Sequence, residues 1–180
     1  MRTVCPWLLL AVLLSTTAPH ARELPPPDQL TVEGVGLRRA AQAGRTHLLG
    51  SLDLYTISLY SNSSIERERL AAADVAKALR IDVTCTDDAR LRLGFDWRRE
   101  LVPRLESRAM AHLIGSFAPL RHGDVVQIEF VPTKGTTVRV NKAVAVSGAH
   151  HDLMLAFLDH WLGERPVSDE IKRTLLASSW

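Results

Sequence analysis

Three segments in the first half of the chain carry the apolar pattern of β-strands, at residues 30–35, 48–60 and 78–85. The third segment is the clearest, because its apolar side chains recur at every second position from Leu79 to Cys85 and would share one face. Residues 38–44 lie between the first two strands and are predicted to form a polar connection. The first half is therefore expected to contribute three strands to a sheet.

Helical segments are predicted from their caps and from the spacing of their apolar residues. They cover residues 65–73, 87–101, a stretch that restarts after Pro103 and continues to Phe117, 151–162, and a last helix that follows Ser168. The helix over 151–162 is amphipathic and is expected to end at Gly163, in the manner of a glycine that terminates a helix at C′. Ser168 is expected to cap the last helix.

A β-hairpin is predicted in the last third of the chain. Its strands cover residues 125–131 and 136–140, and Pro132-Thr133-Lys134-Gly135 forms the turn. Residues 144–146 are predicted to form a further short strand. Because the strands are joined by hairpins and do not alternate strictly with helices, the pattern predicts an α+β fold, with an antiparallel sheet and helices packed on one face.

The N-terminus has the pattern of a secretory signal peptide. One positive charge at Arg2 precedes an apolar run from Val4 to Leu14, and small residues follow, with cleavage predicted after Ala21. We therefore expect a signal peptide at 1–21, a proline-rich leader at 22–29, a single domain over 30–180, and a periplasmic or secreted protein. The apolar run is too short for a comfortable membrane span, and no transmembrane span is expected in the mature chain.

Charge and cysteine content narrow the possible functions. The formal net charge of +2 and the absence of a long basic run exclude a nucleic-acid-binding surface from our expectations. Cys5 leaves with the signal peptide, so Cys85 remains alone and no intramolecular disulfide is expected. The seven histidines are not spaced as metal ligands. No phosphate loop or dinucleotide fingerprint is present, and neither a metal nor another cofactor is expected.

A set of residues in the last third of the chain resembles the chalcone isomerase fold family, in particular its exported bacterial chalcone-isomerase-like branch. The matching residues are Gly123-Asp124, Phe130-Val131-Pro132, Gly135-Thr136-Thr137, Val138, Val140, Trp161-Leu162-Gly163, Pro166-Val167-Ser168, Ile171-Lys172 and Leu175-Leu176. A weaker match covers Leu54-Tyr55 and Leu59-Tyr60. The resemblance implies an open-faced β-sandwich, a large antiparallel sheet with helices layered over one side.

The resemblance also implies where the polar groups of the family's isomerase reaction would lie. Its arginine falls at about His47, although Arg45 would take that place after a two-residue slip of the strand. Its strand threonine falls on Tyr55, and its last hydroxyl residue falls on His160. The helix at about residues 88–98, which should supply a tyrosine and an asparagine, contains neither. Because nearly every polar position is changed, the family's own reaction is not expected here.

Three functions therefore remain open. The first is a non-catalytic binding domain for a small apolar or carboxylated molecule, fatty-acid-like or aromatic, held between the sheet and the helices. Its expected binding residues are Arg45, His47, Tyr55, Tyr60 and Trp161. The second is an isomerase or lyase that acts on a flavonoid-like or other enone, with His47, Tyr55 and His160 as acid–base groups. The third is a ligand-free interaction protein of the cell envelope.

Each of these residues also has a purely structural interpretation. The two tyrosines lie in an apolar strand and could be core residues, and Trp161 could be a packing anchor beside Gly163. The helical phase of His160 relative to Phe157 favours a surface position. His47 lies near the start of a predicted strand.

Overall fold

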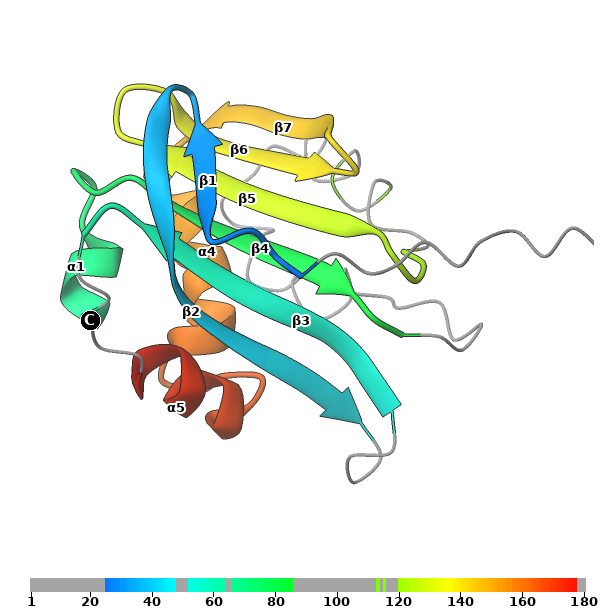
Figure 1. Ribbon diagram of the computed structural model, residues 1–180. Coiled ribbons are helices and arrows are strands. Elements are labelled where there is room, and N and C mark those ends of the chain that lie inside the picture. Colours follow the sequence, from blue (N-terminus) through cyan, green and yellow to red (C-terminus); the bar gives the residue numbers. More distant parts are fainter. Residues whose placement is uncertain are drawn as a thin grey trace, which may run out of the picture.

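The structure is a computed structural model that describes residues 25–47, 52–63, 66–85, 113, 115 and 120–177. The predicted signal peptide and the predicted helix over 87–101 lie outside these residues. The described strands form one antiparallel sheet in the order β1-β2-β3-β4-β5-β6-β7 (Figure 1). Their bounds are Gln29–Val32 (β1), Val35–His47 (β2), Leu52–Ser61 (β3), Lys77–Val83 (β4), Val125–Val131 (β5), Gly135–Val140 (β6) and Ala143–Ala149 (β7).

The start of the sheet differs from the sequence-based prediction. The segment predicted as one strand contains a tight turn, because Glu33 and Gly34 both have positive φ, at 48° and 83°. This geometry joins β1 to β2 as a two-residue hairpin. The predicted connection at 38–44 is wrong, since these residues lie inside β2. There Ala41 and Ala43 are buried while Gln42 is exposed, so the polar residues occupy the outward positions of a strand.

The helices of the described ranges lie on one side of the sheet, as predicted (Figure 1). They are α1 (Arg67–Ala71), α4 (His151–Leu162) and α5 (Asp169–Ala177). The larger apolar cluster lies on this side, which we call the core face, and includes Ile57, Leu79 and Phe157. A smaller cluster around Tyr60 and Leu37 lies on the opposite side, which we call the outer face. The predicted antiparallel sheet with helices on one face is confirmed.

The C-terminal helices begin and end close to the predicted residues. Ser168 Oγ accepts a hydrogen bond from the backbone N–H of Ile171 at 3.4 Å, as expected of a cap. Gly163 does end α4, but its φ of −66° is not left-handed. A Cβ at this position would collide with the carbonyl group of Asp159, which accepts the Gly163 N–H at 3.0 Å. The glycine is therefore required for close backbone approach, and it does not have the left-handed conformation that is usual for a C′ glycine.

Candidate functional site

A buried hydrogen bond joins the sheet to α4 on the core face. The indole Nε1–H of Trp161 donates to the hydroxyl of Tyr55 over 3.1 Å. Trp161 is fully buried, and Tyr55 is 4% exposed. Both side chains therefore combine a large apolar surface with a satisfied polar atom, which is the usual condition for burying tyrosine and tryptophan. The residues of this pair are far apart in the chain, and the fold brings two of the predicted binding residues together.

Arg45 lies next to this pair. In the register of β2 and β3, Arg45 is directly opposite Tyr55. Residues that face each other across antiparallel strands project to the same side, so Arg45 shares the core face with Tyr55. Its side chain is half-buried, and among the described residues the ion pairs involve other arginines, not Arg45. We refer to Arg45, Tyr55 and Trp161 as the core-face site.

His160 belongs to the surroundings of this site. It is 7% exposed, and its ring meets the Trp161 ring edge-on, with the centroids 4.8 Å apart and the planes at 87°. The surface position favoured from the sequence is wrong. His160 follows Phe157 by three residues, and residues three apart lie on the same side of a helix. Both side chains are therefore buried in α4.

His47 is the last residue of β2, not the first residue of a strand. Its backbone pairs with Leu52, the first residue of β3. Its side chain lies outside the described residues, and so its predicted role in binding or catalysis stays a prediction. In Figure 1 the end of β2 and the start of β3 extend past α5.

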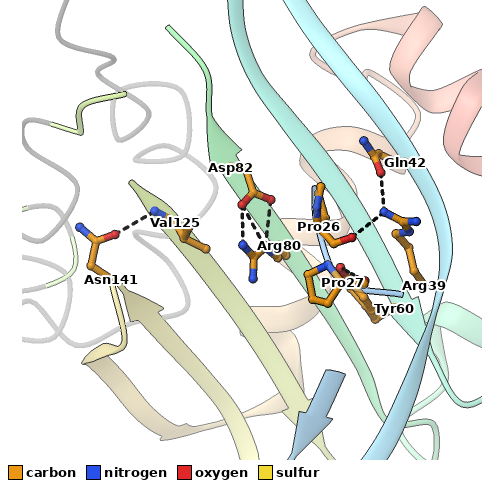
Figure 2. A network of polar contacts seen from close by, with 9 residues as sticks. All are labelled: Pro26, Pro27, Arg39, Gln42, Tyr60, Arg80, Asp82, Val125 and Asn141. Carbon is orange, nitrogen blue, oxygen red and sulfur yellow. Dashed lines mark hydrogen bonds and ion pairs between the residues drawn. The ribbon is translucent and has the colours of Figure 1, made fainter. Parts of the chain in front are cut away.

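Tyr60 lies on the outer face and does not share a site with Tyr55. It is fully buried in the smaller cluster, and its hydroxyl donates to the carbonyl of Pro27 at 2.8 Å (Figure 2). Burial is the main cause that raises the pKa of the Tyr60 hydroxyl above its ordinary value. Arg39 Nη1 donates to the carbonyl of Pro26, also at 2.8 Å, and Arg39 pairs with Asp28. Tyr60 thus holds the proline-rich leader across the sheet.

The outer face carries further charged pairs. Arg80 and Asp82, two residues apart on β4, form a multiply hydrogen-bonded pair at 2.7–3.0 Å (Figure 2). Arg139 donates to Glu129 at 3.1 Å across β5 and β6. Arg80 and Arg139, like Arg39, therefore each face a carboxylate, which offsets the positive charge of these described arginines.

The sequence-based prediction missed a second polar cluster on the core face. Lys77, the first residue of β4, is fully buried, and its Nζ lies 3.1 Å from Nε2 of His151 at the start of α4. Burial lowers the pKa of Lys77 to about 8. The signal was present in the sequence, because Lys77 continues the alternation of Leu79 and Ile81 and so must project to the buried side. The predicted strand begins at residue 78 and therefore leaves Lys77 outside the sheet.

The described residues show no metal site. Within the described ranges, no three His, Cys, Asp or Glu side chains gather as metal ligands would. No helix in those ranges is long and apolar enough to cross a membrane. Cys85 is buried on the core face, as the strand pattern predicted.

Comparison with known proteins identifies the family. The family model described as chalcone isomerase-like matches residues 23–177. The chain belongs to the chalcone isomerase-like family. A solved structure of the same fold is the fatty-acid binding protein of Arabidopsis thaliana, with a TM-score of 0.57 and 15% sequence identity over 82% of this chain and 95% of that chain. At this identity the likeness shows the fold, and it confirms the predicted open-faced architecture. No curated protein sequence matches the chalcone isomerase-like chain significantly.

Proposed function

We propose that this chalcone isomerase-like protein is exported and binds a small molecule with an apolar body and a carboxylate, without catalysing a reaction. The observation that carries the proposal is the position of Arg45, directly opposite Tyr55 on the apolar side of the sheet. A guanidinium group stays charged at any physiological pH and matches the two oxygens of a carboxylate. The neighbouring core-face side chains would contact the apolar body.

Two further observations support binding over catalysis. The Tyr55 hydroxyl accepts the Trp161 N–H, and His160 is packed against the indole, so both groups have structural roles at this place. An acid–base catalyst needs a proton-transfer group within reach of its substrate, whereas Tyr55 and His160 each contact the Trp161 indole. The structural neighbour is by its name a fatty-acid binding protein, which makes a fatty-acid-like ligand the first to test.

The test compares saturated fatty acids of graded chain length with the fatty alcohols of the same length, by isothermal titration of the mature protein. An acid held by Arg45 should lose affinity in Arg45→Gln by about tenfold to a hundredfold, because a hydrogen bond to a charged group contributes roughly 1.5–3 kcal/mol. The alcohol should be affected much less. Arg38→Gln is the matched control, since Arg38 is an exposed arginine on the same strand.

Two results would contradict the proposal. Equal loss of affinity in the Arg45 and Arg38 variants would mean that only general electrostatics attracts the acid. Turnover of an enone that disappears in His160→Ala while the melting temperature is unchanged would favour the isomerase hypothesis. Export is tested separately, by the mass of the protein recovered from its host: a mature chain that begins at Arg22 agrees with the predicted signal peptide, and an intact Met1 contradicts it.

A further inference from the structure

The buried Lys77 side chain connects three elements of the core face. Its Nζ donates to the backbone carbonyls of Leu70 and Ala72, each at 2.6 Å, at the C-terminal end of α1. Its third contact is Nε2 of His151, at 3.1 Å, in the first turn of α4. A lysine ammonium has three protons to donate, so the two carbonyls and the imidazole use all of them.

This geometry fixes the protonation state of His151. To accept a hydrogen bond from the ammonium, Nε2 must be without its own hydrogen, and the neutral ring must carry its proton on Nδ1. A proton on Nε2 would place two donors and two positive charges 3.1 Å apart. The centroid of the Phe130 ring lies 4.4 Å from the centroid of the imidazole and 4.9 Å from Nζ of Lys77. The aromatic face attracts one cation but supplies no counter-charge.

Within the described part of the chain, the charged groups around the pair do not neutralise a second proton. Asp74, after α1, favours the charged form of Lys77 but makes its ion pair with Arg69. Asp152 favours the charged form of His151, yet burial and the charge of Lys77 outweigh it, in that order, and lower the pKa of His151. His151 is also at the N-terminal end of α4, where the helix dipole disfavours a cation.

We propose that Lys77 and His151 form a pH-sensitive lock that fastens the N-terminal end of α4 and the C-terminal end of α1 to the sheet, and that opens when His151 takes up a proton. His151 is half-buried, so solvent protons reach it. Lys77 is fully buried and, from its position in β4, contacts both α1 and α4. The other end of α4 carries Trp161 of the core-face site, so the lock acts on the helix that forms that site. The proposal does not depend on any ligand.

The direction of the pH effect follows from the lowered pKa of His151. In the closed state the ring resists protonation, and in the open state it titrates at about 6.5, the ordinary value. The closed state is therefore fully favoured above pH 6.5 and loses stability as the pH falls below that value. At pH 5.5 the opening equilibrium should rise by up to about tenfold, because one pH unit below the open-state pKa corresponds to one factor of ten.

Hydrogen exchange of the full mature chain tests the lock at pH 7.5 and 5.5, after correction for the intrinsic exchange rate at each pH. Amides of α4 near Leu153 should lose up to about tenfold of their protection at the lower pH, while amides of β6 should not. His151→Gln keeps an acceptor for Lys77 but does not titrate, and its α4 amides should keep their protection. His150→Gln is the matched control, because His150 is exposed and adjacent, and it should behave as the wild type.

The proposal is overturned if the wild type and His151→Gln lose protection equally, or if His150→Gln also abolishes the pH effect. Should His151→Gln fail to fold, the wild type still decides the matter through the imidazole resonances of His151. These should titrate below pH 6.5 in the wild type and shift towards the ordinary value in Lys77→Met. A His151 resonance that titrates at the ordinary value in the wild-type protein contradicts the lock.

Discussion

Replacement of Lys77 by methionine should abolish a rise in the free energy of unfolding that we expect as the pH increases above about 8. Methionine is similar in length to lysine and cannot be charged, so the variant keeps most of the buried volume and loses the titration. In the folded protein burial lowers the pKa of Lys77 to about 8, whereas the ordinary pKa of an exposed lysine is 10.5. Folding therefore expels a proton between these two values.

The size of the effect follows from the difference of about 2.5 pKa units, each worth about 1.4 kcal/mol. At pH 7 the charged lysine lowers the free energy of unfolding by about 3 kcal/mol relative to a neutral one. Because the unfolded chain binds the proton more tightly, the free energy of unfolding should rise as the pH increases from 8 towards 10.5. Between pH 8 and 10 the rise is about 2 kcal/mol.

Urea unfolding followed by circular dichroism at pH 7.5, 8.5, 9.5 and 10 measures this rise. The relevant quantity is the wild-type value minus the Lys77→Met value, because other groups contribute to both proteins. Tyr60 is such a group: its raised pKa makes stability fall as the pH passes about 10, and subtraction removes this contribution. A difference that stays constant within about 0.5 kcal/mol from pH 8 to 10 would refute the reasoning, whatever its absolute value.

Two further predictions concern the C-terminal end of α4. A double-mutant cycle of Tyr55→Phe and Trp161→Phe should give a coupling free energy of about 0.5–1.5 kcal/mol for their buried hydrogen bond, measured by urea unfolding; additive single effects would show that the bond contributes nothing. Gly163→Ala should lower the free energy of unfolding by about 1–3 kcal/mol, because its methyl group meets the Asp159 carbonyl. Gly36→Ala, with open space around it, is the control, and equal losses in both would contradict the steric argument.

The elements predicted best from the sequence are those with strong local signals. α4 was predicted at the observed residues, because apolar spacing over 151–162 is followed at once by a glycine. The sequence signals for β4 and for the turn before β6 also lie within a few neighbouring residues. The predicted connection at 38–44 failed because half of β2 faces the polar outer side, where arginine and glutamine are as acceptable as in a loop.

The candidate site was predicted less completely, and the reason is that it depends on register. The pairing of Arg45 with Tyr55 belongs to a register that shifts directly after Arg45, and a slip of one residue would have put the arginine on the other face. Tyr60 and Tyr55 are both tyrosines of the same strand, but they are five positions apart. Because side chains of a strand alternate between its two faces, an odd offset places the two tyrosines on opposite faces. The role of Lys77 required knowing that α1 ends and α4 begins above it.

The consecutive strand order has a consequence for how the protein folds. Most neighbouring strands are joined by short connections, but β4 and β5 are separated by the chain from Thr84 to Asp124. Bringing β4 and β5 together over this sequence separation costs entropy before the pairing contributes any stability. The helix α5 packs against β2, but α5 belongs to the C-terminal half of the chain. The strands β1 to β4 taken alone therefore lack this helix. The larger described core combines residues of both halves, so the two should assemble in one cooperative step, and fragments divided between Thr84 and Asp124 should fold only on meeting each other.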